Sequence, residues 1–199
     1  MSHRVFISYH HDNDQWAKDE LVKLGENIFE DVSVDTGDID ENLPDERIRE
    51  IIRDEYLKSS SVTILLVGTE TKHRKHINWE LYSSMYDGKV NKKSGIIVIN
   101  LPSVGCDECC IAKHDGEKES VFSEVSNWVS ISSKEEYERL YPYMPAIIID
   151  NLVALDVKIS VIPWNKVTVD KLAYMIDRAY EDRASCKYDL SRPMRSNNS

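Results

Sequence analysis

Short apolar runs alternate along this chain with segments in which apolar residues recur every three or four positions. Five runs rich in Val, Ile and Leu predict strands at residues 5–9, 32–34, 62–67, 96–100 and 157–162. Helical spacing predicts helices at residues 12–24, 44–56, 79–87 and 168–180. Residues 144–155 fit a strand or a helix, but Pro145 and the spacing of Ile148, Leu152 and Leu155 favour a helix.

This alternation of strands and helices predicts an α/β fold with an open parallel five-stranded sheet and helices on both faces. The common flavodoxin-like winding gives the strand order 2-1-3-4-5. Residues 101–143 fit no simple repeat, so we interpret them as an insertion after the fourth strand, with one short helix at residues 133–140. We expect a single domain over residues 1–184, followed by a disordered polar tail, residues 185–199.

The charge of the chain narrows the classes of partner. A formal net charge of −10 over 199 residues argues against broad nucleic-acid binding, which needs a basic face, and against an anionic membrane surface. The first residues contain no signal-peptide apolar region, and no apolar run approaches the roughly 20 residues of a membrane span. We therefore expect a soluble, cytoplasmic protein.

Three cysteines and a histidine lie close together within the insertion, as Cys106, Cys109, Cys110 and His114. These residue types can ligate zinc, so a structural metal site is one interpretation. Adjacent cysteines rarely both point at one ion, however, and no second paired half follows. We favour reduced thiols in a loop and expect no metal site.

The predicted topology places one group of charged residues beside the usual ligand site of this fold. In a 2-1-3-4-5 sheet, ligands bind at the carboxyl ends of strands one and three, where the strand order reverses. The loops at residues 9–14 and 68–75 flank that crevice. The second loop carries the basic run 72–76 (KHRKH), and Glu80 follows in the first turn of the expected helix. We expect its carboxylate to face a cavity at the rim of the sheet.

The chain lacks the sequence motifs of several classes of nucleotide-binding and hydrolytic proteins. The chain contains no G-x-G-x-x-G, no G-x-x-x-x-G-K-[ST] and no G-x-S-x-G sequence. A phosphorelay receiver needs an aspartate at the end of strand three, where this chain has Val67, Gly68 and Thr69. Dinucleotide-binding Rossmann, P-loop, serine-hydrolase and receiver functions are therefore not expected.

Three other segments occur in the order and at the spacing of a known family. Residues 5–9 (VFISY) match its F-I-S-Y opening, the acidic turn 35–45 lies where the family has its BB loop, and residues 76–81 (HINWEL) are similar to its W-V-x-x-E-[LI] motif. The chain thus resembles a TIR (Toll/interleukin-1 receptor) domain of the bacterial TIR-like branch found in Thoeris antiphage defence. The resemblance covers residues 4–100, and the last strand and helix more loosely. Two departures are His76 at the motif's tryptophan position and the long insertion.

The resemblance implies an enzyme that cleaves NAD, with NAD as the substrate, no separate cofactor and Glu80 as the catalytic residue. Cleavage releases nicotinamide and gives the ribose oxocarbenium character, which one nearby carboxylate can stabilise. The helix dipole should keep a first-turn glutamate ionised. The product would be an ADP-ribose derivative, cyclic or conjugated, that signals to a downstream effector.

Further residues are candidates for binding the nucleotide, and each has a simpler structural interpretation. The strand-end residues can contact ribose or base, or serve only packing and capping; the basic run can offset pyrophosphate charge or be a solvated face; the tryptophan can stack on a ring or belong to the core. The candidates are Ser8, Tyr9, His10, Asp38, Lys72, Arg74, Asn78 and Trp79.

Two other functions remain open at this point. One is a non-catalytic signalling module that assembles into a homo-oligomer through the BB-like loop, with Ile39 and Leu43 in the contact. The other is a sensor that binds NAD or ADP-ribose without turnover. Release of nicotinamide from NAD separates the enzyme from both.

Overall fold

The computed structural model describes residues 3–33, 43–126 and 131–198. Five parallel strands form one sheet in the order β2-β1-β3-β4-β5, which confirms the predicted α/β winding. The strands are β1 (His3–Ser8), β2 (Phe29–Asp31), β3 (Val62–Val67), β4 (Gly95–Asn100) and β5 (Ile159–Pro163). Because β1 lies between β2 and β3, the strand order reverses there. The carboxyl ends of β1 and β3 therefore flank the expected ligand crevice.

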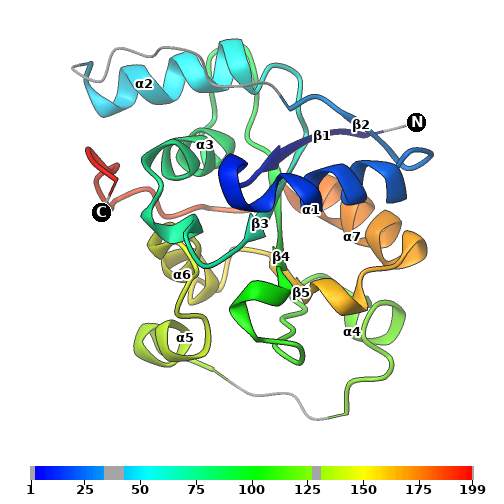
Figure 1. Cartoon of the computed structure of the whole chain (residues 1–199). Coiled ribbons are helices and arrows are strands. Elements are labelled where there is room, and N and C mark those ends of the chain that lie inside the picture. The colour runs from blue at the N-terminus through cyan, green and yellow to red at the C-terminus, as the bar shows by residue number, and fades with distance from the viewer. Residues whose placement is uncertain (1–2, 34–42, 127–130, 199) are drawn as a thin grey trace.

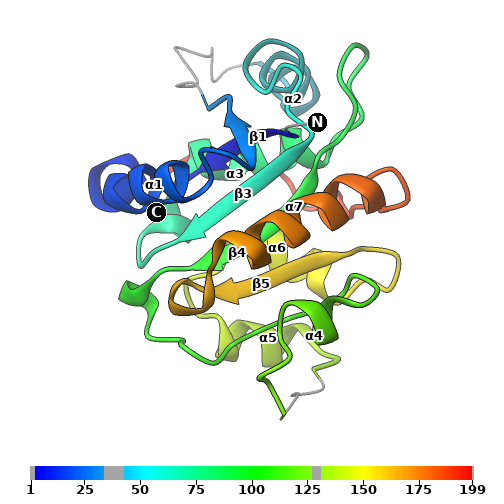
Figure 2. The ribbon, with the colours of Figure 1, turned by 90° about the vertical axis from the view of Figure 1, so that its right-hand side faces the viewer.

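Helices cover both faces of the sheet (Figures 1 and 2). One face carries α1 (His11–Leu24), α4 (Glu117–Ser120) and α7 (Val169–Asp182). The other carries α2 (Asp45–Ile51), which continues as the π-helical segment η1 (Ile52–Tyr56), with α3 (Lys75–Met85), α5 (Lys134–Leu140) and α6 (Ala146–Leu152). Short 3₁₀ segments are η2 (Thr71–His73), η3 (Pro102–Val104) and η4 (Trp164–Lys166).

Alternate residues of the central strands supply the two hydrophobic cores between these layers. In β3, Ile64 and Leu66 pack with α1 and α7, whereas Leu65 and Val67 pack with α2, α3 and α6. All six residues of β3 are buried. Successive side chains of a strand point to opposite faces, so a sheet covered on both sides needs such a continuous apolar run.

The structure corrects two predicted elements. Strand β2 lies at Phe29–Asp31, three residues before the predicted segment 32–34. Helix α3 begins at Lys75 rather than at residue 79 and ends at Met85. The predicted helices in the second half are confirmed, because Ser133 and Thr168 accept backbone hydrogen bonds as the N-caps of α5 and α7, and α6 follows Pro145.

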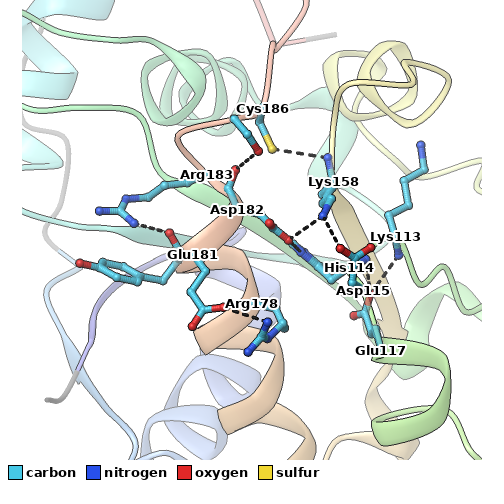
Figure 3. Close-up of polar contacts among 12 residues, drawn as sticks. Lys113, His114, Asp115, Glu117, Lys158, Arg178, Glu181, Asp182, Arg183 and Cys186 are labelled. Carbon is cyan, nitrogen blue, oxygen red and sulfur yellow. Dashed lines mark hydrogen bonds and ion pairs between the residues drawn. The ribbon is translucent and has the colours of Figure 1, made fainter.

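The insertion is attached to the edge of the sheet and to α7. Ile111 forms an antiparallel bridge with Val161 of β5. The buried His114 ring holds Asp182 at the end of α7, with 2.6 Å between Nδ1 and Oδ2 (Figure 3). Glu117 accepts the backbone N–H groups of residues 113 and 114. These contacts make the insertion part of the domain.

The cysteine cluster does not converge on a common point. Cys106 and Cys109 form a disulfide, which corrects the expectation of reduced thiols at these two positions, whereas Cys110 is a free thiol. His114 is engaged with Asp182 instead. Within residues 3–33, 43–126 and 131–198, no three His, Cys, Asp or Glu side chains are grouped as metal ligands.

The tail after α7 is not the disordered segment that its polar composition suggested. The backbone carbonyl of Asp189 accepts a hydrogen bond from Asn151, and Arg192 donates to both carboxylate oxygens of Asp150. Further on, the Arg195 backbone binds α3. The tail thus runs over α6 and α3 (Figure 1). Among the described helices, none is both long enough and apolar enough to cross a bilayer.

Candidate active site

Glu80 meets the end of β1 at the carboxyl edge of the sheet. Its side chain is 7% exposed, and the Ser8 hydroxyl donates to its Oε2 atom at 2.6 Å. This meeting follows from the topology, because β1 pairs with β3 as far as Ser8 and α3 leaves the loop after β3. The switch point of the sheet therefore contains a buried carboxylate that accepts a hydroxyl hydrogen bond.

The position of Glu80 along its helix differs from the expectation. Since α3 begins at Lys75, Glu80 is its sixth residue and lies in the second turn. The helix dipole acts mainly within the first turn, so it contributes less to ionising this carboxylate than was expected. A hydrogen bond from the Ser8 hydroxyl holds the carboxylate at this position.

His10 and Arg74 form a second group at the same edge. Burial and the nearby Arg74 charge lower the pKa of His10, against the opposing effects of Asp12 and Glu70, so the ring is neutral at pH 7. The Nδ1 atom of His10 and the Nε atom of Arg74 are buried without a hydrogen-bond partner in the described structure. Buried polar atoms in this condition are uncommon, and a bound ligand or water is one explanation for them.

Asp14 is a further polar residue at this edge that the sequence did not single out for the site. It is buried in α1, and burial raises the pKa of its carboxyl group. The carboxylate lies against Gly68, where an added Cβ would come within 2.4 Å of Asp14 Oδ2. A side chain at residue 68 would displace the Asp14 carboxyl group, so glycine lets the loop after β3 approach α1 this closely. A glycine directly after a buried strand was the available sequence signal.

Three other predicted binding residues point away from Glu80. Tyr9 donates to Gln15 on α1 at 2.6 Å. Trp79 and Asn78 instead bind the backbone of Arg195, at 2.8 and 2.9 Å. Residues two apart on a helix differ by about 200° in direction, which places Asn78 opposite Glu80. The candidates on α3 thus serve two different surfaces.

A cavity of about 560 Å³ lies on this second surface, beneath the tail. Lys72 and Asn78 line it, together with Arg192 and Arg195 of the tail. The Lys72 ammonium group donates to the carbonyl of Pro142 at 2.5 Å. Two of the predicted nucleotide-binding residues therefore line a cavity, but it is not the one expected beside Glu80.

Glu80 itself lines none of the three cavities identified in the described part of the chain. The expectation that its carboxylate opens into a hollow at the rim of the sheet stays a prediction. The structure brings together Ser8, His10, Arg74 and Glu80 at the switch point. Asp38, the remaining candidate, lies outside the described residues.

Comparison with known proteins identifies the first half of the chain. The family model described as "Thoeris protein ThsB, TIR-like domain" matches residues 6–105. The matched range contains the second half of β1, the strands β2 to β4, the Ser8–Glu80 contact and the start of the insertion. Searches of curated proteins and of solved structures returned no match.

Proposed function

The chain belongs to the Thoeris ThsB TIR-like domain family, whose role is in antiphage defence signalling, and we propose that it serves this role as an enzyme that cleaves NAD at Glu80. The observation that carries the proposal is the Glu80 carboxylate, held by Ser8 at the carboxyl edge of β1. A TIR-like domain with its motif glutamate at the switch point of the sheet has the one acid that this reaction needs.

The proposed reaction breaks the bond between the nicotinamide nitrogen and C1′ of the adjoining ribose. The bonding electrons go to the pyridinium nitrogen, so nicotinamide leaves as a neutral molecule without protonation. The ribose acquires oxocarbenium character, which the ionised Glu80 stabilises. Water then adds to C1′ and releases a proton, or another atom of the same ADP-ribose adds and gives a cyclic product. Either product is a soluble signal for a separate effector.

The groups around Glu80 suit the rest of the substrate. Arg74 carries a positive charge, and its unpartnered Nε can donate to a phosphate oxygen. The unpartnered Nδ1 of the neutral His10 ring can accept from, or donate to, a ribose hydroxyl or the base. Binding NAD would thereby satisfy buried atoms that the described protein residues leave unsatisfied.

The burial of Glu80 sets a condition on this activity. With only 7% of the side chain exposed, NAD cannot reach the carboxylate unless neighbouring groups move. We therefore expect slow turnover by the isolated chain and faster turnover once self-association or a defence trigger opens the site. Substrate-induced or assembly-induced closure and opening of this kind is a common control of enzyme rate.

The test follows nicotinamide by chromatography after concentrated protein is incubated with NAD. Glu80→Gln should lower the initial rate by about 10²–10³, because it removes the charge that stabilises the transition state. Glu119→Gln, an exposed site on α4, removes the same charge elsewhere and should keep the wild-type rate. Equal rates for wild type and Glu80→Gln would contradict the proposal.

A second function draws support from the same burial. A signalling module or nucleotide sensor that performs no chemistry needs no access to Glu80, and the enclosed carboxylate then serves only to hold β1 against α3. Calorimetry separates these two: a sensor gives a saturable signal with NAD and leaves the ligand intact, whereas an assembly module gives none. Nicotinamide release dependent on Glu80 would exclude both.

A further inference from the structure

A second large cavity lies at the opposite, amino edge of the sheet. Its volume is about 590 Å³, and its walls come from the start of β1, the segments that precede β3 and β4, and the end of α7. These are residues 3–4, 59–61 and 90–93, with side chains from Arg53, Tyr180 and Arg183. The volume falls within the roughly 300–1,000 Å³ typical of small-molecule sites.

The lining of this amino-edge cavity is strongly cationic, although the whole chain has a net charge of −10. Its lysine and arginine side chains are Arg4, Arg53, Lys92, Lys93 and Arg183. Among the described lining residues, the single carboxylate is Asp177, which is held by His3 at 2.8 Å. The cavity thus concentrates positive charge that its own lining does not balance.

Arg53 carries much of this unbalanced charge. It is 1% exposed and donates to the Ser94 hydroxyl and the Ser60 carbonyl, each at 2.9 Å, and no described carboxylate lies within ion-pair distance of it. Burial lowers the pKa of its guanidinium group to about 10, so the group remains charged at neutral pH. A buried charge without a counter-ion is costly in a protein, which indicates that a ligand supplies the opposite charge.

The two acids that favour the charged form of Arg53 already have other partners. Asp54 accepts hydrogen bonds from the backbone and side chain of Asn91, at 3.0 and 3.3 Å. Asp87 is paired with Lys93 at 3.4 Å. Both acids favour the charged form of Arg53, yet neither lines the cavity. Each acid is therefore engaged with another residue rather than with Arg53.

Arg183 faces the cavity from the end of α7. Its guanidinium carbon lies 3.7 Å from the centre of the Tyr180 ring, and it donates to the carbonyl of the same residue. The positive charge of Arg183 disfavours the charged form of Arg53, because the two like charges repel each other. Both guanidinium groups therefore influence the same cavity. In the described part of the chain, Arg183 has no carboxylate partner within ion-pair distance. An arginine stacked on an aromatic ring has its orientation fixed before a ligand arrives.

We propose that the amino-edge cavity binds a small phosphate-bearing molecule of mononucleotide size, with Arg53 and Arg183 as the phosphate ligands. Arginine suits this task because its planar fork of donors matches the geometry of phosphate oxygens. The serine hydroxyls along one wall already donate to backbone carbonyls, so the arginines are the donors that this site offers to a phosphate. This site is separate from Glu80, which lies at the other end of the strands, and does not depend on the NAD-cleaving proposal.

The proposal is tested by isothermal titration calorimetry with AMP as the probe and adenosine as the probe without phosphate. Wild-type protein should bind AMP saturably and adenosine not at all. Arg183→Gln should weaken AMP binding about tenfold or more, the equivalent of one charge-assisted hydrogen bond. Lys92→Gln, at an exposed position, should weaken it a few-fold through the loss of longer-range attraction.

Arg178→Gln is the matched control. Arg178 lies on the same helix, is paired with Glu181 at 2.9 Å and extends in a different direction from Arg183 (Figure 3). Its replacement removes the same charge without touching the cavity, so the AMP affinity should stay within about twofold, as expected for an exposed charge away from the ligand. Coincident thermal unfolding curves for both variants would show that folding is not the cause of any difference.

Three results would overturn the proposal. They are an absence of saturable AMP binding at millimolar concentration, equal binding of adenosine and AMP, and equal losses in Arg178→Gln and Arg183→Gln. The same titration with Glu80→Gln protein should give the wild-type affinity. Failure of this site and failure of NAD cleavage are therefore observed in different variants and by different measurements.

Discussion

The carboxyl and amino edges of the sheet differ in the partners that they give to a buried charged side chain. At the carboxyl edge, the Glu80 carboxylate is enclosed and accepts a hydrogen bond from Ser8. At the amino edge, the Arg53 guanidinium is equally enclosed, but its partners are neutral. At the carboxyl edge, the fold itself supplies a hydrogen-bond donor to the buried charge. At the amino edge, the fold supplies only neutral partners, and the positive charge is left for a bound ligand.

This difference gives substitutions at the two edges opposite expected signs. Removing the partner of a satisfied buried carboxylate costs stability, because the carboxylate remains in a place where water cannot replace the lost donor. Removing a buried charge that has no counter-ion relieves a desolvation cost and can increase stability. Stability measurements can therefore separate a structural polar contact from a charge retained for binding.

Ser8→Ala should give the largest effect. It removes the donor to Glu80 Oε2 and should lower the free energy of unfolding by about 2 kcal/mol, within the range for an unsatisfied buried group. Urea denaturation at pH 7 measures the change. If Glu80 is catalytic, nicotinamide release should also fall, because the carboxylate loses the group that orients it.

Ser83→Ala provides a matched control on α3. Ser83 is fully buried, but its hydroxyl has no hydrogen-bond partner in the described structure. Its removal should leave the free energy of unfolding unchanged within about 0.5 kcal/mol, as expected where no bond is lost. Equal destabilisation by Ser8→Ala and Ser83→Ala would show that the Ser8–Glu80 contact contributes nothing particular to the carboxyl edge.

The sequence predicted the central strand best and the start of α3 less well. Strand Val62–Val67 was located correctly because an apolar run buried on both faces is distinct from its flanking residues. Strand β2 was misplaced because it contributes one buried residue, Phe29, whereas Val32 lies just beyond it. The start of α3 was missed because Lys75 and His76 give no capping signal, and no side chain caps the helix.

Only those features of the candidate site that follow from the strand order could be predicted from the sequence. The winding brought Ser8 and Glu80 to one crevice, and the structure places them in contact. The directions of side chains on α3 depend on the helix start, so an error of four residues there hid the separation of Asn78 from Glu80. Asp14 was missed because its importance arises from the approach of Gly68, a contact between distant segments.

The cavity at the amino edge could not be predicted from sequence patterns, for a different reason. Its cavity is built from single residues on separate loops and one helix end, with no motif among them. The tail was misjudged for a related reason. Its polar composition is typical of disorder, but Arg192 finds a specific partner in Asp150, and sequence periodicity contains no information about such pairs.

Arg53→Met should give a smaller effect than Ser8→Ala and one of opposite sign. Burial lowers the folded-state pKa of Arg53 to about 10, below the ordinary value of a guanidinium group, so the charged group opposes folding at every pH below about 10. The Ser94 hydroxyl already donates to the Ser60 carbonyl at 3.4 Å, and this contact does not involve Arg53. We expect the free energy of unfolding to rise by about 1–2 kcal/mol in urea denaturation at pH 7.

The same variant should lose AMP binding, so stability and binding change in opposite directions. That combination would identify Arg53 as a residue retained for a ligand at the expense of stability. A loss of 2 kcal/mol or more would instead assign Arg53 to the structure, and the contrast between the two edges would disappear. Arg178→Gln again serves as the control, because its ion pair is exposed to solvent.

Asp150→Asn should give the smallest effect, and it tests whether the tail is fixed at the carboxyl edge by charge. Burial alone raises the pKa of Asp150, but hydrogen bonds from Arg192 and Lys134 lower it overall below its ordinary 3.8. A carboxylate with a lowered folded-state pKa stabilises the fold above its unfolded pKa, and this contribution is lost as the pH falls through the folded-state value. The variant should therefore be about 1 kcal/mol less stable than wild type at pH 7 and at pH 5, with the difference shrinking below about pH 4.

Asp156→Asn, which breaks an exposed pair with Lys187, should change stability by less than about 0.5 kcal/mol at each pH. A deficit for Asp150→Asn that persists unchanged at pH 3 would mean that shape, rather than the carboxylate charge, holds the tail over α6 and α3.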